Sequence, residues 1–208
     1  DYERFVQSFN HNARPAEVLK VGAYETDPSY IYPFAKVCNL NTYLEEHAAH
    51  SYQLGVNIDV FPIDGLPCDI KDSNRLFRKI RVLRQLHSMK MMRRREGRSL
   101  HKEAIRAAIQ PLLWPLSVQQ LVADIIRISK THRYEESEHV GCIVWGYGKR
   151  ERMRKAVFEE SVDVIFEGHT FKAPVGHHEY LTALYGEYMM LPSVEDRKTH
   201  HMFRAYWK

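Results

Sequence analysis

The chain has 208 residues, of which 44% are hydrophobic, and a formal net charge of +4. This length can bury one sizeable core, so we expect a single domain over residues 1–208, and no apolar run reaches the roughly 20 residues that span a bilayer. Cys38, Cys68 and Cys142 are odd in number and form no CxxC pair, which argues against a disulfide framework and favours free thiols and a cytoplasmic location.

The first elements along the chain are expected to be one helix and three strands. Residues 1–10 predict a helix with Asp1 as its cap and its apolar side chains on one side. Residues 30–40 are rich in β-branched and aromatic residues and predict a strand, and a second strand is expected over residues 42–47. The third strand lies within residues 55–61 and has the clearest alternation of the three.

The stretch GVNIDVFPIDG, residues 55–65, has one aspartate inside this third strand and another just past its end. Alternation predicts two different faces for the strand. One face carries Val56, Ile58 and Val60, and the other carries Asn57, Asp59 and Phe61. The following Pro62 and the pair Asp64 and Gly65 predict a tight turn directly after the strand, where it would support the residues of the strand end.

Residues 73–92 predict an amphipathic helix inside a basic helical segment, residues 71–106. The segment contains 13 Lys or Arg residues against three acidic residues, so its net charge is +10 and the rest of the chain carries −6. A solvated helix face is the simplest interpretation. The alternative is a surface for an anionic acceptor or for the inner membrane leaflet. Its arginines would be Arg75, Arg78, Arg81, Arg93, Arg94 and Arg95.

The second half of the chain is expected to mix helices and strands without regular βαβ alternation. Ser117 and Gln120 resemble a capping box, ahead of a helix that runs to about residue 130. Residues 163–174 predict a strand, a turn and a strand, and residues 177–189 predict a helix that ends at Gly186 or shortly after. This order of elements predicts an α+β architecture.

Asp59 is charged where its strand neighbours are apolar, and the residues alone leave two interpretations open. It either caps a loop or pairs with a lysine, or it binds Mg²⁺, which prefers carboxylate oxygens and substrate phosphates. Lys36 alternates onto the same face of its strand as Tyr30, Tyr32 and Phe34. It either meets Asp59 or a phosphate across the sheet, or extends to solvent as a surface lysine.

Several blocks of the sequence resemble the LicD family of CDP-alcohol-dependent phosphotransferases. Residues 55–67, GVNIDVFPIDGLP, resemble the family signature IDIFPLDG. Similar blocks are FAKVCNLNT at 34–42, FEGHTFKAPVGHHEYLTALYGEYMMLP at 166–192 and EDRKTHH at 195–201. The blocks follow the family's order over nearly the whole chain. The family includes bacterial phosphocholine transferases and is similar to the catalytic domains of fukutin and fukutin-related protein.

The resemblance implies a nucleotidyltransferase-type fold, with a mixed sheet flanked by helices and carboxylates that hold Mg²⁺. Asp59 matches the third of these carboxylates. The other two belong to an aspartate-rich family strand that is absent here, so we expect the chain to be truncated at its N-terminus. Lys36 and Thr42 match residues expected at the donor phosphates. Arg197, His200 and His201 match a C-terminal pattern whose role is phosphate binding or packing.

The function implied by the resemblance is Mg²⁺-dependent transfer of a phospho-alcohol, phosphocholine first of all, from a CDP-linked donor. The acceptor would be a hydroxyl of an anionic or lipid-linked cell-surface glycan, such as lipopolysaccharide or teichoic acid, and the enzyme would contact the membrane peripherally. The alternative is a catalytically incompetent binding module that lacks the upstream carboxylates. Nucleic acid is not an expected partner, because the basic segment lacks interleaved aromatic residues.

Overall fold

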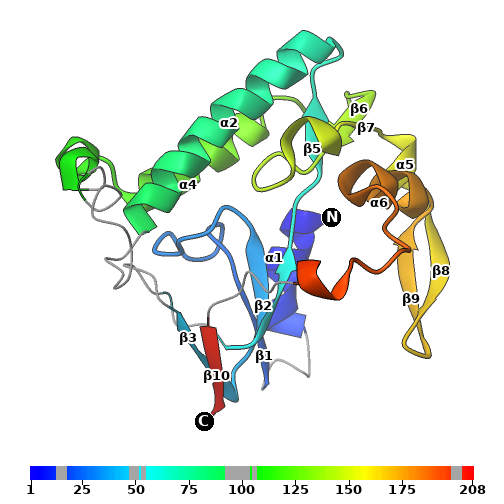
Figure 1. The fold of residues 1–208 in the computed structure, drawn as a ribbon, viewed down its shortest axis with the longest axis horizontal. Coiled ribbons are helices and arrows are strands. Elements are labelled where there is room, and N and C mark those ends of the chain that lie inside the picture. The colour runs from blue at the N-terminus through cyan, green and yellow to red at the C-terminus, as the bar shows by residue number, and fades with distance from the viewer. Residues whose placement is uncertain (13–17, 47–51, 53–54, 92–103, 105–106, 198–202) are drawn as a thin grey trace. The chain divides into compact units, whose positions relative to one another are not determined.

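The computed structural model describes residues 1–12, 18–46, 52, 55–91, 104, 107–197 and 203–208 (Figure 1). The chain folds into two compact units. The first unit contains residues Asp1–Pro62, Ile80–Ile128 and Thr199–Lys208, and the second contains Ile63–Lys79 and Ser129–Lys198. Within the described ranges, no helix combines the length and the apolar character needed to cross a membrane.

The first unit is built around a three-stranded antiparallel sheet in the order β1-β2-β4. Its described elements are α1 (Tyr2–Asn12), β1 (Leu19–Gly22), β2 (Ala35–Asn39), β3 (Thr42–Glu46), β4 (Asn57–Val60), the C-terminal part of α2 (Ile70–Met91), η2 (Gln110–Leu113), α4 (Val118–Ser129) and β10 (Phe203–Trp207). The last strand, β10, pairs with β3 in a separate two-stranded sheet.

One face of the β1-β2-β4 sheet packs against α1. Val6 from the helix and Val21 and Ala35 from the strands are buried together, and Phe5 and Val60 pack around them. These strand residues share a face because alternate side chains of a strand point the same way. Burying an apolar side chain of this size contributes roughly 1.5–3 kcal/mol, so the face stabilises the unit.

The N-terminus of α4 is capped by a side chain. The Ser117 hydroxyl accepts a hydrogen bond from the backbone N–H of Gln120 at 2.9 Å, which confirms the predicted cap of α4. Val118 and Val122 of this helix are buried against Ile31. His87 of α2 is also buried, and its Nε2 donates to the Ile31 carbonyl at 2.7 Å. The helical periodicity of both predicted helices is therefore confirmed.

The second unit contains a small three-stranded sheet and a hairpin, with short helices between them. Its described elements are β5 (Asp64–Leu66), the N-terminal part of α2, β6 (His139–Gly141), η3 (Gly148–Glu151), β7 (Met153–Arg154), α5 (Ala156–Glu159), β8 (Ser161–Phe166), β9 (His169–Pro174), α6 (His177–Tyr185) and η4 (Val194–Asp196). The sheet has the order β5-β6-β7, and β8 pairs with β9. The predicted hairpin is confirmed, with positive φ angles of 48° and 79° at its turn residues Glu167 and Gly168.

A buried carboxylate organises the second unit. Glu151 is almost fully buried, and it accepts hydrogen bonds from the Tyr147 backbone N–H at 2.7 Å and from the Tyr180 hydroxyl at 2.8 Å. Burial, and then this hydrogen bond, raise the pKa of the Tyr180 phenol. Because a buried carboxylate is costly without partners, these contacts explain how Glu151 is tolerated and why η3 and α6 stay together.

The predicted tight turn after β4 was wrong. Asp64 and Gly65 do not form a turn; they begin β5, where Asp64 lies opposite Gly141 and Gly65 opposite Val140. A side chain at position 65 would meet the backbone carbonyl oxygens of His132 and Arg133 at 2.7 and 2.6 Å. The glycine is therefore explained by close backbone approach in a strand and not by a reversal of the chain.

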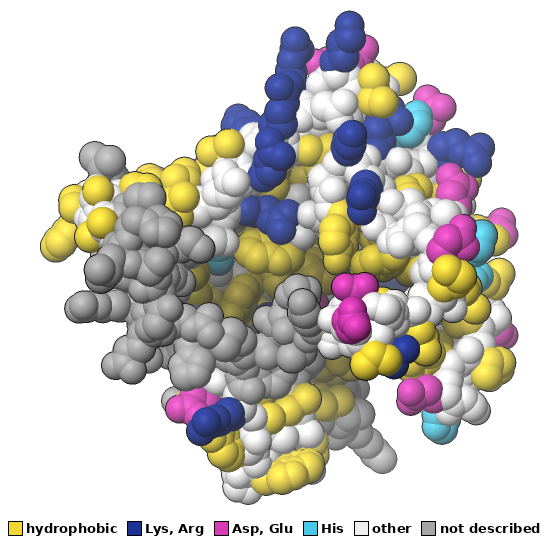
Figure 2. Space-filling view, in the orientation of Figure 1, with side chains coloured by type: hydrophobic (Ala, Val, Ile, Leu, Met, Phe, Trp, Pro, Cys, Tyr) yellow, Lys and Arg dark blue, Asp and Glu magenta, His cyan; other side chains and the backbone are white. Residues whose placement is uncertain are grey.

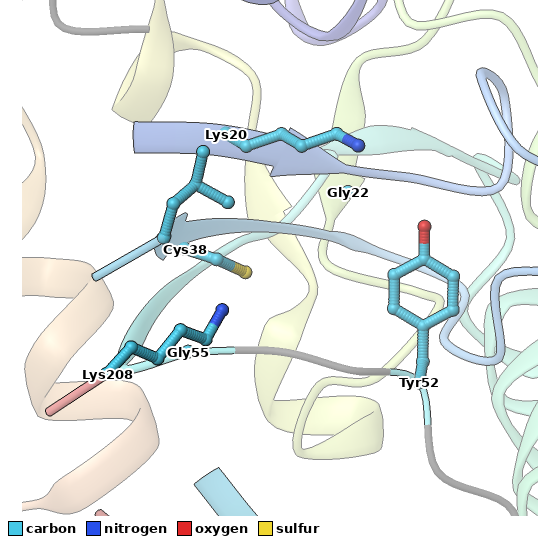
Figure 3. A pocket seen from close by; sticks show the side chains of 7 residues that line it. Lys20, Gly22, Cys38, Tyr52, Gly55 and Lys208 are labelled. Atoms are coloured by element: carbon cyan, nitrogen blue, oxygen red, sulfur yellow. The ribbon is translucent and has the colours of Figure 1, made fainter. Parts of the chain in front are cut away.

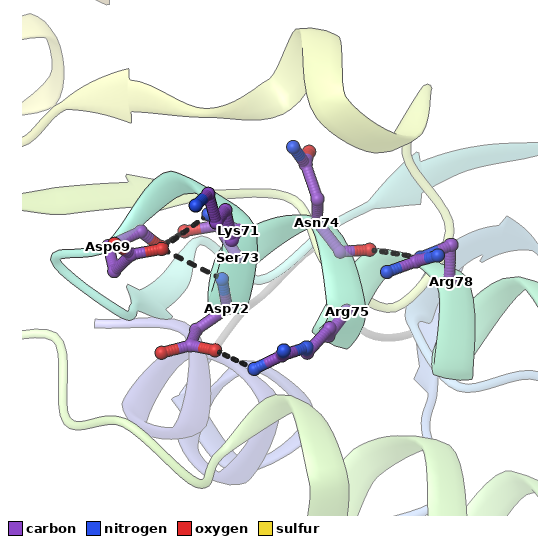
Figure 4. A network of polar contacts seen from close by, with 7 residues as sticks. All are labelled: Asp69, Lys71, Asp72, Ser73, Asn74, Arg75 and Arg78. Carbon is purple, nitrogen blue, oxygen red and sulfur yellow. Dashed lines mark hydrogen bonds and ion pairs between the residues drawn. The ribbon is translucent and has the colours of Figure 1, made fainter.

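The start of α2 and the form of the sheets also differ from expectation. The helix begins at Ile70 and not at residue 73, because Asp69 Oδ1 accepts hydrogen bonds from the backbone N–H of Lys71 at 2.6 Å and of Asp72 at 3.2 Å (Figure 4). The α+β class is confirmed. The described strands, however, form four small antiparallel sheets in place of one mixed sheet.

Candidate functional site

The face of the β1-β2-β4 sheet opposite to α1 carries polar side chains. Lys36 lies opposite Asp59 across the β2–β4 ladder, and Cys38 lies opposite Asn57. On the other side of β2, Lys20 lies opposite Cys38. Because these residues occupy alternate positions on their strands, they share one face. The same three strands therefore present an apolar face to α1 and a polar face away from it.

Lys36 and Asp59 form an ion pair on this polar face. The Lys36 Nζ lies 2.6 Å from Asp59 Oδ1, and it also donates to Asn57 Oδ1 at 3.0 Å. The Lys36 side chain is 11% exposed and that of Asp59 is 39% exposed. The ammonium is therefore largely desolvated, whereas the carboxylate reaches solvent. The interpretation of Lys36 as an extended surface lysine is excluded, and its predicted meeting with Asp59 is confirmed.

Aromatic rings surround the ammonium group of Lys36. Its Nζ lies 4.9 Å from the ring centroid of Tyr32 and 5.4 Å from that of Phe34. Phe34 in turn packs on Phe61 with a centroid separation of 4.6 Å. A cation over an aromatic ring gains roughly 0.5–2 kcal/mol, more when it is desolvated. The rings thus hold the ammonium in place beside the carboxylate.

The ion pair confirms one of the two interpretations of Asp59, pairing with a lysine, and the same carboxylate also fits part of a Mg²⁺ site. Mg²⁺ is commonly held by one or two carboxylates together with substrate phosphates and water. Asp59 is partly exposed, and a carboxylate can accept from Lys36 through Oδ1 while Oδ2 faces a cation. Within the part of the chain that the structure describes, no group of three or more His, Cys, Asp or Glu side chains could hold a metal ion. Asp59 therefore fits as one ligand of an ion that phosphates would complete.

Thr42 has a structural role in the same unit. Its buried hydroxyl donates to the Asn39 carbonyl at 2.8 Å and accepts from the Val56 backbone N–H at 2.7 Å. Both contacts fix the turn between β2 and β3 to the segment that enters β4. With its proton donated to the backbone, the hydroxyl is not available to a phosphate, so we do not carry Thr42 into the proposed site.

A cavity of about 360 Å³ opens on the polar face next to the ion pair (Figure 3). Its lining residues are Lys20, Gly22, Cys38, Leu40, Tyr52, Gly55 and Lys208. Lys36 lies opposite Gly22 and two positions from Cys38 in β2, so the pair and the cavity share a boundary. Figure 3 shows the Lys20 and Lys208 side chains entering from separate segments, with the Cys38 sulfur and the Tyr52 ring facing the same space.

The Tyr52 side of the cavity is held by a hydrogen bond and a ring contact. The Tyr52 hydroxyl donates to Asp27 Oδ2 at 2.7 Å, and its ring packs edge-on against the buried Tyr30 at 4.9 Å between centroids. Burial, and then the contact with Asp27, raise the pKa of the Tyr52 phenol to about 12. The Ser29 side chain, and then Tyr52, lower the pKa of the Asp27 carboxyl by hydrogen bonding. Tyr52 is therefore a fixed, neutral wall.

The cysteine of the cavity is a buried thiol. Burial raises the pKa of Cys38 from 9.0 to about 11, and the neighbouring Lys36 lowers it by a smaller amount. Cys38, Cys68 and Cys142 are all free, as the sequence predicted. Because the thiolate is the reactive form, Cys38 is a packing residue of the cavity and not a nucleophile.

Apart from the arginines of α2, the other residues singled out from the sequence belong to the second unit or lie outside the described residues. Asp64 and Gly65 belong to the second unit, as does Arg197, whose Nε donates to the Pro192 carbonyl at 3.0 Å. His200 and His201 lie outside the described residues, as do Arg93, Arg94 and Arg95. Their predicted roles stay predictions.

The predicted basic surface on α2 is partly neutralised by local contacts. Figure 2 shows Lys and Arg side chains gathered over this helix. Arg75 pairs with Asp72 at 2.7 Å, and Arg78 Nε donates to the Asn74 carbonyl at 3.4 Å (Figure 4). Arg81 is exposed. Contact with an anionic membrane or acceptor stays a prediction, to which Arg75 contributes less than an unpaired arginine would.

Comparison with known proteins bears on what this site does. The chain is 26% identical over 215 aligned residues to the lipopolysaccharide cholinephosphotransferase LicD of Haemophilus influenzae, and the alignment covers 99% of this chain and 76% of that protein. Over nearly its whole length, the chain is therefore similar to a LicD protein. No family model and no solved structure matches the chain. The resemblance found in the sequence blocks is therefore confirmed across the whole chain.

Sequence reasoning missed several residues of the polar face. Lys20 lies in a four-residue strand whose alternation is too short to stand out, and Tyr52 lies between segments without a strong pattern. Lys208 reaches the cavity because β10 pairs with β3, which is more than 150 residues away in the sequence. The alternation of residues 19–22 was the one local signal, since it places Lys20 and Gly22 on the same face.

Proposed function

We propose that this chain transfers a phospho-alcohol, phosphocholine first of all, from a CDP-linked donor to a hydroxyl of a cell-surface glycan. The observation that carries the proposal is the Lys36–Asp59 ion pair, which lies on a polar sheet face beside a cavity. The similarity to a lipopolysaccharide cholinephosphotransferase supports the reaction class and makes lipopolysaccharide the first acceptor to test. The IDVFPIDG block that contains Asp59 supports the same assignment.

The chemistry is a displacement at the phosphorus atom that carries the alcohol. The acceptor oxygen forms a new bond to this phosphorus, the bond to the bridging oxygen of the donor breaks, and cytidine monophosphate leaves with the bridging oxygen. The acceptor proton passes to a carboxylate or to water. Such reactions depend mostly on positioning and on neutralising charge around the phosphoryl group.

Lys36 and Asp59 have distinct roles in this proposal. Lys36 is a point charge held by Asn57, Asp59 and two aromatic rings, and it would neutralise a donor phosphate that approaches the polar face. Asp59 would hold Mg²⁺, which supplies charge neutralisation for the phosphates when it is bound. A nucleotidyltransferase-type arrangement around β2 and β4 is part of the same proposal, and it is supported by the resemblance of the sequence blocks.

The test is transfer of labelled phosphocholine from CDP-choline to lipopolysaccharide by the full-length protein, with and without Mg²⁺. Asp59→Asn keeps the size of the side chain and removes the charge that a hard cation needs, so we expect transfer to fall by about 100-fold or more. Thermal unfolding should change little, since the amide oxygen of the introduced asparagine can still accept a hydrogen bond from Lys36.

The matched control is Asp163→Asn. Asp163 forms an ion pair with Lys172 at 2.7 Å in the hairpin of the second unit, and its side chain is 60% exposed. The Asp163→Asn variant loses the same charge and the same kind of ion pair as Asp59→Asn, but at a residue that is not part of the proposed site. Equal transfer rates for Asp59→Asn and wild type would contradict the assignment, and absence of transfer by the wild-type chain would favour a binding module.

A further inference from the structure

The cavity beside the ion pair has an unusual balance of charge. Two lysines, Lys20 and Lys208, line it, and no Asp or Glu side chain is among its lining residues. The nearest carboxylate that bears on it is Asp27, which accepts from Tyr52 and interacts electrostatically with Lys20. Within the ranges that the structure describes, neither lysine takes part in an ion pair or a side-chain hydrogen bond. Two ammonium groups that face one space repel each other, and an anion between them removes that repulsion.

The chemistry of the two lysines favours a phosphate group as the anion. A lysine ammonium is a compact, strongly hydrated charge with three donors, and it binds phosphate well as a point charge. The volume of about 360 Å³ lies in the range of small-molecule sites and exceeds what inorganic phosphate alone would fill. The occupant is therefore expected to be a phosphate that carries an organic group.

The walls of the cavity suit a flat organic group. The Tyr52 ring is fixed by Asp27 and by Tyr30, and its hydroxyl proton is already donated. It therefore offers a ring surface and not a hydrogen bond from its hydroxyl. Leu40 and the Cys38 thiol are the other non-basic side chains of the lining. Rigid aromatic and apolar walls with a few convergent charges are typical of pockets for small ligands.

The position of the cavity links it to the Lys36–Asp59 pair. Cys38 lines the cavity and lies two residues from Lys36 on the same face of β2, a separation of about 7 Å along a strand. The two phosphorus atoms of a diphosphate lie closer together than this, and the long lysine side chains can bridge the difference. A ligand with a phosphate in the cavity can thus place a second phosphate at Lys36 and Asp59.

We propose that this cavity binds the nucleoside monophosphate part of the donor, with Lys20 and Lys208 as its phosphate contacts. The choice of a cytidine nucleotide rests on the proposed function, whereas the phosphate contacts rest on the cavity itself. The remaining phosphate of the donor then lies at Lys36, next to Asp59. Lys20 and Lys208 hold the leaving nucleotide, and Lys36 neutralises the phosphate of the transferred group.

The experiment is calorimetric titration of the full chain with cytidine monophosphate, in the presence of EDTA so that binding is measured apart from catalysis. Lys20→Gln with Lys208→Gln should weaken binding by about 10-fold or more, since two charged contacts are lost. Lys79→Gln is the matched control, because Lys79 is an exposed lysine of α2 that does not line the cavity. It should bind like the wild type. Thermal unfolding of all variants should be similar.

Two outcomes would overturn the proposal. One is equal affinity of the double variant and the wild type for cytidine monophosphate. The other is inorganic pyrophosphate that binds as tightly as cytidine monophosphate, because the cavity would then recognise phosphate without a nucleoside. Failure here is distinguishable from failure of the proposed function. Transfer that depends on Asp59 without lysine-dependent nucleotide binding overturns only the cavity assignment, and lysine-dependent binding without any transfer overturns only the function.

Discussion

The two faces of the β1-β2-β4 sheet use the same three strands for different ends. Toward α1, Val21, Ala35 and Val60 exclude water and stabilise the unit. On the opposite face, Lys36 and Asp59 form an ion pair next to a cavity. The contrast teaches that adjacent residues of one strand can be selected for different properties, because alternation separates them by the thickness of the sheet. Mutations on one face should therefore affect stability, and mutations on the other should affect transfer.

The largest effect is expected from a charge on the apolar face. Ala35 is fully buried, so Ala35→Asp places an unpaired carboxylate against α1 and should lower the free energy of unfolding by about 4 kcal/mol or more. Ile58→Asp is the control. Ile58 lies on the same face of the sheet as Ala35, because it is opposite Val37 in the β2–β4 register, but it is 72% exposed. Urea denaturation measures both variants. Similar costs at the two positions would show that burial against α1 is not what distinguishes them.

A smaller and different effect is expected from Lys36→Met on the polar face. Methionine fills the volume of the lysine stem and keeps contact with the rings of Tyr32 and Phe34, but it supplies no charge to a phosphate. We expect transfer to fall by roughly 10- to 100-fold, and the melting temperature to change much less than for Ala35→Asp. Lys36→Arg keeps the positive charge but replaces the compact ammonium with a planar guanidinium, so it tests whether charge alone is sufficient for transfer. A loss confined to the melting temperature would make Lys36 structural.

The smallest effect concerns the pH dependence of Cys38. Its pKa of about 11 leaves only about a thousandth of the thiol ionised near pH 8, so alkylation should be slow and rise about tenfold per pH unit. The exposed Cys68 should react first. Peptide mass spectrometry after timed alkylation separates the two sites. Fast modification of Cys38 near neutral pH would show that the polar face is more open than the structure indicates.

The same pKa has a consequence for stability. Burial favours the protonated thiol, so the folded state keeps its proton at pH values where an unfolded cysteine, with a pKa of 9.0, has lost it. The contribution is therefore fully present below pH 9 and is lost as the pH rises from 9 toward about 11. Replacement of Cys38 by alanine should remove this part of the alkaline destabilisation.

The sequence predicted those features that depend on local patterns. Alternation placed Lys36 with aromatic residues and allowed it to face Asp59, and the strand, turn and strand predicted over residues 163–174 form a hairpin. The Asp64–Gly65 pair has the composition of a tight turn. It lies in a strand, however, because only glycine allows the backbone there to pack closely against neighbouring carbonyls. A dipeptide alone cannot distinguish these two uses of glycine.

The cavity was not predictable from local patterns, because its walls are assembled from distant segments. Lys20 and Lys208 come together only through the pairing of β1 with β2 and of β10 with β3. A single sequence carries no signal for such pairing beyond the short strands themselves. Asp59 stood out because a charge in an apolar strand is costly, whereas an exposed lysine in a short strand is ordinary.

The Lys36–Asp59 pair also bears on how the first unit responds to heat. Hydration of charged groups becomes less favourable as temperature rises, so the cost of desolvating the ammonium falls, whereas the gain from apolar burial levels off. Lys36 is largely desolvated in the folded chain, and its two oxygen partners stay in place. Warming therefore lowers the desolvation cost of this pair while the stabilisation from the face that packs on α1 levels off.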